Sequence, residues 1–326
     1  MRHREFRYRR PRRSRGLFWV LLGLAGIGTA AVVLGERRRR SSAPDRPEET
    51  PSAQDFYPPG YLAEPPESVS VWVPGPAGNL YVRDGGKSER IPIVFVHSLA
   101  GNGGQWALQL DHLRRRRRAV SLDLRGHGES DPADDGDYSI AGLAADIEAV
   151  ADQLGMRRFI LGGHSLGSVV AIEYASRHPE RVAGLLLVDP NGDMTSMPPD
   201  QKESFVSPLR QDPIAELTSY FRQLIVGGDA DAARWVLEDL RLTDEDAVVK
   251  ALESSMEYPV IEALGKYSGP KLAVISDMNN LPYSLHRMLP ELTARLMTGT
   301  GHWLMMDRPE LFNRIVDEFL EEVEGA

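Results

Sequence analysis

The 326-residue chain has no cysteine, and this absence removes several kinds of chemistry at once. A disulfide framework, a thiolate metal site and a cysteine nucleophile all require that residue. The eight histidines show no paired spacing typical of metal ligands, and the chain has no glycine-rich loop suited to a nucleotide or phosphate. We therefore expect no metal and no cofactor.

Basic residues are scarce outside the first forty positions. Those forty hold 12 of the 38 lysines and arginines but only two of the 47 acids, Glu5 and Glu36. The other 286 residues carry 26 basic and 45 acidic side chains, a net charge of −19. Because phosphates repel so acidic a surface, we expect no nucleic-acid partner.

One long uncharged, mostly apolar run, Leu17 to Gly35, lies near the N-terminus between two groups of arginines. At 1.5 Å per residue, a helix of this length just spans a hydrocarbon core of about 30 Å. We expect a membrane helix at 17–35, preceded by a basic segment at 1–16 and followed by a Pro- and acid-rich linker at 36–67. A cleaved signal peptide is the alternative.

The same arginines predict an orientation in the membrane. Eight arginines precede the apolar run and four follow it. The side with more basic residues stays in the cytoplasm. We expect a single-pass protein of the cell membrane, in contact with the lipid bilayer through its helix, with the remaining domain outside the cytoplasm.

From residue 68 onward, short apolar runs rich in β-branched residues alternate with helical patterns. This alternation predicts an α/β domain over 68–326, with a mostly parallel eight-stranded sheet covered by helices. Over about 191–267 the alternation stops, and amphipathic helices predict a lid inserted between two strands. The predicted lid helices are Ile214–Leu224, Ala230–Leu240 and Asp244–Tyr258. The predicted strands are Val69–Val73, Leu80–Arg83, Ile93–Val96, Ala119–Leu122, Phe159–Gly162, Leu185–Val188, Lys271–Ile275 and Arg295–Met297.

The run Gly163-His164-Ser165-Leu166-Gly167 matches the pattern G-x-S-x-G. It follows a predicted strand and precedes a helical pattern, which is the setting of a nucleophile elbow. Glycine on both sides of the serine relieves crowding in so tight a turn. We predict that Ser165 is a nucleophile, supported by Gly163 and Gly167.

Two further loops complete a candidate site. His302 follows the last predicted strand and precedes the terminal helix, where a general base for the serine is expected. Upstream, the strand ending at Val96 runs into a loop of small residues that begins with His97. The backbone N–H groups of Leu99 and Leu166 are the predicted oxyanion donors.

The segments DLRGHGES, GHSLG and GHWLMMDRPELFNRIVDEFL, taken with this loop, resemble the α/β-hydrolase superfamily, particularly its small-lidded esterase-like members. The resemblance covers about residues 68–324. It implies Ser165 as nucleophile, His302 as base, oxyanion donation from Leu99 and Leu166, and His97 as loop support. The implied substrate is a small-molecule ester.

The triad acid departs from the family pattern. Where the family commonly has Gly-x-x-Asp after a late strand, this chain has Ser-Asp-Met-Asn, with Asn279 at the position of the Asp. Asp277, directly after Ser276, is the first candidate, and Asp189, at the end of an earlier strand, is the second. The third alternative is that no acid is present.

Together these features predict a serine hydrolase that transfers an acyl group to water, most simply a carboxylesterase acting on small or medium acyl esters. Two alternatives remain open. The same triad serves cofactor-free peroxidation of carboxylates or hydrolysis of carbon–carbon bonds. A relative that binds ligands without catalysis is the other alternative.

Overall fold

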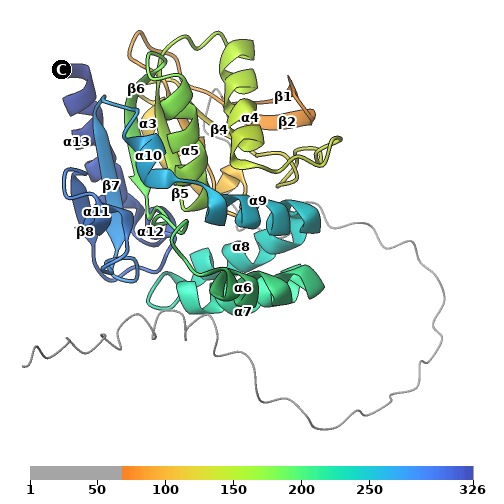
Figure 1. The fold of residues 1–326 in the computed structure, drawn as a ribbon. Helices are drawn as coiled ribbons and strands as arrows, with labels where there is room; N and C mark the ends of the chain where they lie inside the picture. Colours follow the sequence, from red (N-terminus) through yellow and green to blue (C-terminus); the bar gives the residue numbers. More distant parts are fainter. Residues whose placement is uncertain (1–67, 326) are drawn as a thin grey trace, which may run out of the picture.

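The computed structural model describes residues 68–325, in which a mostly parallel sheet carries helices on both faces (Figure 1). The strand order is β1-β2-β4-β3-β5-β6-β7-β8, and of these eight strands only β2 runs opposite to the rest. The strands are β1 Val69–Gly75, β2 Gly78–Asp84, β3 Ile93–Val96, β4 Ala119–Leu122, β5 Phe159–His164, β6 Val182–Val188, β7 Lys271–Ser276 and β8 Ala294–Met297.

The helices form two layers around the sheet. Helices α4, α5 and α10 pack together on one face, while α3, α12 and α13 pack together on the other (Figure 1). Outside the insertion between β6 and β7, the helices are η1 Gly103–Trp106, α3 Ala107–Arg114, α4 Ile140–Gln153, α5 Leu166–Arg177, α11 Leu285–Met288, α12 Leu304–Asp307 and α13 Pro309–Gly325.

The insertion between β6 and β7 is helical, as the amphipathic patterns predict. Its helices α6 to α9 lie together at the lower end of the sheet in Figure 1. Aspartate side chains cap the starts of three of them, because each accepts hydrogen bonds from backbone N–H groups of the first turn. The inserted helices are α6 Pro199–Gln211, α7 Pro213–Leu224, α8 Ala230–Asp239, η2 Leu240–Leu242, α9 Glu245–Glu257 and α10 Val260–Leu264.

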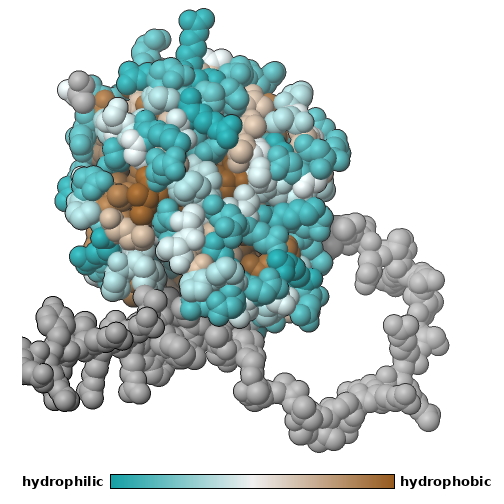
Figure 2. All heavy atoms as spheres, viewed as in Figure 1, coloured by the Kyte–Doolittle hydropathy of each residue, from teal (hydrophilic) through white to brown (hydrophobic). Residues whose placement is uncertain are grey.

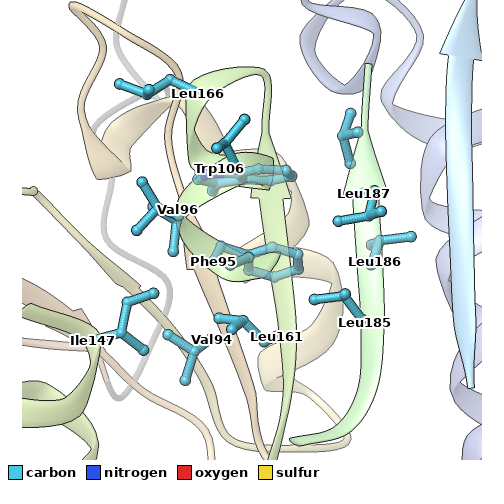
Figure 3. Close-up of a cluster of buried hydrophobic side chains, with 14 of the residues drawn as sticks. Val94, Phe95, Val96, Trp106, Ile147, Leu161, Leu166, Leu185, Leu186 and Leu187 are labelled. Carbon is cyan, nitrogen blue, oxygen red and sulfur yellow. The ribbon is translucent and has the colours of Figure 1, made fainter. Parts of the chain in front are cut away.

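Strands β3, β4, β5 and β6 are buried along their whole length, as expected for parallel strands covered on both faces. The ring of Trp106 stacks on that of Phe95 with 4.4 Å between centroids, and Leu185 to Leu187 of β6 lie beside them (Figure 3). Strands β3 and β5 are parallel neighbours in the sheet. Their carboxyl ends therefore present two loops at one edge of the sheet.

On the face shown in Figure 2, apolar atoms are confined to small areas among hydrophilic side chains. Within residues 68–325, no helix is long and apolar enough to cross a membrane. The predicted membrane helix at 17–35, the basic segment at 1–16 and the linker at 36–67 all lie outside the described residues.

Candidate active site

Ser165 occupies a sharp turn between β5 and α5. Its backbone has φ 53° and ψ −115°, a left-handed conformation that is strained for a residue with a side chain. The Ser165 N–H donates to the carbonyl of Val188 at 2.9 Å, which ties the turn to the end of β6. Because α5 starts at the next residue, its free N–H groups lie beside the serine.

Close approach of backbone atoms explains both glycines of the elbow. A Cβ on Gly163 would overlap the carbonyl of Gly167, four residues along the chain. A Cβ on Gly167 would overlap the carbonyl of His97, on the loop that follows β3. Gly163 therefore allows the elbow to close on itself, and Gly167 allows it to approach the β3 loop.

The β3 loop makes a tight turn, in which the N–H of Gly101 donates to the carbonyl of Ser98 at 3.1 Å. Ala100 lies inside this turn with φ 53°. Within residues 68–325, neither the N–H of Leu99 nor that of Leu166 donates to any acceptor. Both predicted oxyanion donors are therefore free to bind a ligand oxygen.

His97 holds the β3 loop in place. Its Nδ1–H donates to the carbonyl of Ser98 at 2.7 Å, and its Nε2 accepts the N–H of Leu124 at 3.0 Å. These bonds require the neutral ring, and burial lowers the pKa of His97 to about 3. His97 thus has the supporting place that the family resemblance implies.

His302 lies in the loop after β8, beside the elbow. Its ring centroid is 4.6 Å from that of His164, the residue before the serine, and His164 Nε2–H donates to the His302 carbonyl at 2.9 Å. The His302 Nδ1 lies 2.7 Å from Asp189 Oδ2. Because a carboxylate only accepts, the neutral ring carries its proton on Nδ1 and its lone pair on Nε2.

Asp189 is fully buried at the end of β6 and is held by three donors. Oδ1 accepts the N–H of Ser276 at 2.8 Å, while Oδ2 accepts the Ser276 hydroxyl at 2.8 Å and the His302 ring N–H. Three bonds of this kind stabilise an ionised carboxylate away from water. The backbone of Asp189 has φ 46°, a third strained position.

The structure brings Asp189 against the imidazole of His302, and not Asp277, which was the first choice of acid. Asp277 is exposed, and its Oδ2 accepts the N–H of Gly299 at 3.0 Å instead of facing the imidazole. Successive side chains of an extended segment point in opposite directions. Because Ser276 turns its hydroxyl toward Asp189, the next side chain, that of Asp277, turns away. Asn279 does not face His302 either, since its amide donates to the Pro190 carbonyl at 2.9 Å.

Backbone strain marks the same place independently. In the described part of the chain, the non-glycine residues with positive φ are Ala100, Ser165 and Asp189. They lie in the β3 loop, the elbow and the β6 loop, the three loops that hold the oxyanion donors, the serine and the carboxylate. Strained residues of this kind cluster at functional sites.

Sequence reasoning missed Ser276, which fixes both oxygens of Asp189. The available signal for Ser276 was its position as a polar residue at the end of an otherwise apolar strand. No group of three or more potential metal ligands exists among residues 68–325.

Comparison with known proteins agrees with this architecture. Residues 91–233 match the family model described as alpha/beta hydrolase fold. The chain is 27% identical over 253 residues to the dihydrolipoyllysine-residue acetyltransferase component of the acetoin cleaving system of Cupriavidus necator, covering 74% of this chain and 66% of that protein. It is 27% identical over 252 residues to the sn-1-specific diacylglycerol lipase of Mus musculus, covering 70% of this chain and 80% of the lipase.

Among solved structures, a thermophilic esterase from Thermogutta terrifontis superposes with a TM-score of 0.65 at 22% identity, covering 78% of this chain and 99% of the esterase. Identity at this level establishes a common fold, and the activities named for these relatives differ from one another. The sheet order, the elbow and the family model lead to one conclusion: the chain has the α/β-hydrolase fold and is similar to hydrolases.

Proposed function

We propose that this protein is a membrane-anchored carboxylesterase that cleaves small or medium acyl esters with Ser165, His302 and Asp189. The supporting observation is the hydrogen bond of 2.7 Å between His302 Nδ1 and Asp189. It forms beside an elbow whose serine has a strained backbone, next to the unbonded N–H groups of Leu99 and Leu166. These are the parts that acyl transfer through a serine requires.

In the acylation step, Ser165 Oγ attacks the ester carbonyl carbon while His302 Nε2 takes the hydroxyl proton. The carbonyl oxygen becomes an oxyanion, which accepts the N–H groups of Leu99 and Leu166. When the C–O bond to the alcohol breaks, His302 returns the proton to the leaving oxygen. Each such donor is worth roughly 10²–10³ in kcat.

In the deacylation step, water replaces the alcohol. His302 removes a proton from the water, and the resulting hydroxide attacks the acyl-serine. Collapse of the second oxyanion breaks the bond to Ser165, which recovers its proton from His302, and the carboxylic acid leaves. Asp189 remains ionised throughout and stabilises the imidazolium that forms in both steps.

The proposed anchor is the apolar run at 17–35, with the hydrolase domain outside the cytoplasm. Its support is the length of the run and the excess of arginines before it. Lipase and esterase activities among the relatives favour an ester substrate over other bonds.

The test is the Ser165→Ala variant, assayed on a series of aryl esters of increasing acyl length. We expect kcat to fall by roughly 10³ or more, because the proposed acyl-enzyme forms on the Ser165 hydroxyl. Ser176→Ala is the matched control, since Ser176 lies further along α5, where its hydroxyl donates to the Glu173 carbonyl. If the Ser165 variant kept a tenth of wild-type kcat, the proposal would be wrong.

A further inference from the structure

The lid ends directly against the loop that carries His302. The carbonyl of Leu224, the last residue of α7, accepts the backbone N–H of His302 at 2.9 Å. One turn earlier, the ring of Phe221 packs edge-on against that of Trp303 with 4.9 Å between centroids. Trp303 in turn lies 5.1 Å from the imidazole of His302.

Asp307, at the end of α12, joins the same two segments through its carboxylate. Oδ1 accepts the N–H of Asp229, the residue that caps α8 of the lid, at 2.8 Å. Oδ2 accepts the N–H of Gly301, the residue before His302, also at 2.8 Å. Burial raises the pKa of Asp307, and these two N–H donors oppose that effect.

The contact between lid and loop is too close for any side chain at residue 301. A Cβ on Gly301 would lie 2.7 Å from the Leu224 carbonyl and 3.2 Å from the Cα of Ile225. Gly228 is similarly close, because its Cβ would lie 2.5 Å from Asp307 Oδ1. The lid and the His302 loop can therefore pack this closely around the Asp307 carboxylate only because residues 228 and 301 have no side chain.

We propose that Asp307 is a positioning residue, which ties the lid to the His302 loop so that seating of the lid and placement of the general base occur together. The proposal rests on the proposed function. Asp307 does not touch the imidazole, whose Nδ1 is already bonded to Asp189. It acts through two backbone N–H groups, one on each segment.

The physical argument concerns what happens without the carboxylate. Asn at residue 307 keeps one acceptor oxygen but places an NH₂ group where the second N–H needs an acceptor. One of the two segments then loses its bond to residue 307, so the lid is held to the loop less tightly. A displacement of His302 by a fraction of an ångström is enough to slow proton transfer, since catalysis depends on close geometry.

The first test compares Asp307→Asn with Asp212→Ala. Asp212 caps α7 by accepting the Ala215 N–H at 3.1 Å, so its loss also weakens the lid but leaves the His302 loop untouched. We expect Asp307→Asn to lower kcat on a short aryl ester by roughly 10- to 100-fold, with KM changed less than threefold. Asp212→Ala should change kcat less than threefold. Equal losses in both variants would overturn the proposal.

A second variant, and a measurement that does not depend on enzyme activity, test the same proposal. Gly301→Ala should reproduce the fall in kcat, because its Cβ pushes the Leu224 carbonyl away. Amide hydrogen exchange should show residues 224–230 and 299–303 losing protection together in Asp307→Asn, and neither losing it in Asp212→Ala. If exchange rose in only one of these segments, the role of Asp307 in joining lid and loop would be refuted, whether or not the wild-type protein is an esterase. If exchange rose in both segments but the wild-type protein had no esterase activity, only the proposed function would be refuted.

Discussion

At the scale of single residues, the hydrogen bonds of Asp189 decide which carboxylate serves His302. Replacing Asp189 with Asn should lower kcat by roughly 10²–10⁴, because the imidazole loses the acceptor that fixes its tautomer. Asp277→Asn should leave kcat within about threefold, since Asp277 faces the Gly299 N–H at the surface. Steady-state kinetics on one aryl ester measure kcat for both variants. A larger loss in Asp277→Asn than in Asp189→Asn would restore Asp277 as the acid.

Buried His97 gives a prediction about pH and stability. Its pKa is about 3 in the folded protein, against an ordinary value of 6.5 when unfolded. Between these values the unfolded chain binds the extra proton, so stability is lost as pH falls from about 6.5 toward 3. Burial also lowers the pKa values of His127 and His164, which act in the same direction.

His97→Asn should therefore flatten the dependence of unfolding free energy on pH. Asn can still donate to the Ser98 carbonyl, but it has no acceptor at the position of the ring Nε2 and leaves the Leu124 N–H without a partner, so we expect a loss of about 1–3 kcal/mol at pH 7.5. The difference in unfolding free energy between the variant and the wild type should be smaller at pH 5 than at pH 7.5. Urea denaturation at several pH values measures this, and a constant gap would contradict it.

At the scale of elements, the lid touches the oxyanion loop as well as the histidine loop. Asp239 at the end of α8 accepts the side-chain amides of Asn102 at 2.8 Å and Gln105 at 3.0 Å. Asn102 also caps the turn that follows the loop, through the Gly104 N–H. The inserted helices are thus bonded to segments on both sides of the nucleophile.

Asp239→Asn should lower kcat by about tenfold, because a single amide oxygen cannot serve both donors and the oxyanion loop loosens. The neighbouring Glu238→Gln is the matched control and should keep kcat within twofold. Kinetics on a short ester together with melting temperatures measure the effect. A melting temperature that falls while kcat stays constant would reduce Asp239 to a purely structural role.

The positions of the strands and helices were also the features best predicted from the sequence. The eight predicted strands and three of the lid helices agree with the structure to within a few residues, since apolar periodicity reports burial directly. The choice between Asp189 and Asp277 was not readable in this way, because it depends on where one side chain points after a strand ends. The contacts of Asp307 with Asp229 and of Asp239 with Asn102 span 78 and 137 residues, beyond any local pattern.

At the scale of the whole molecule, charge and hydropathy divide the chain into a basic apolar N-terminus and an acidic remainder. The 286 residues after position 40 carry a net charge of −19 and are repelled by anionic lipid, which favours a position of the domain away from the bilayer. We predict that protease added to intact cells or spheroplasts degrades the domain while a cytoplasmic marker survives. Protection until lysis would place the domain inside, and recovery in a salt-washed soluble fraction would exclude the anchor.

The most direct measurement of the central claim is covalent labelling of the whole protein with a fluorophosphonate, followed by mass mapping of the peptides. The proposed chemistry predicts one adduct, on Ser165, with labelling lost in Ser165→Ala and slowed in Asp189→Asn. A folded wild-type protein that forms no adduct, or forms it on another residue, would contradict the assignment of Ser165 as an activated nucleophile.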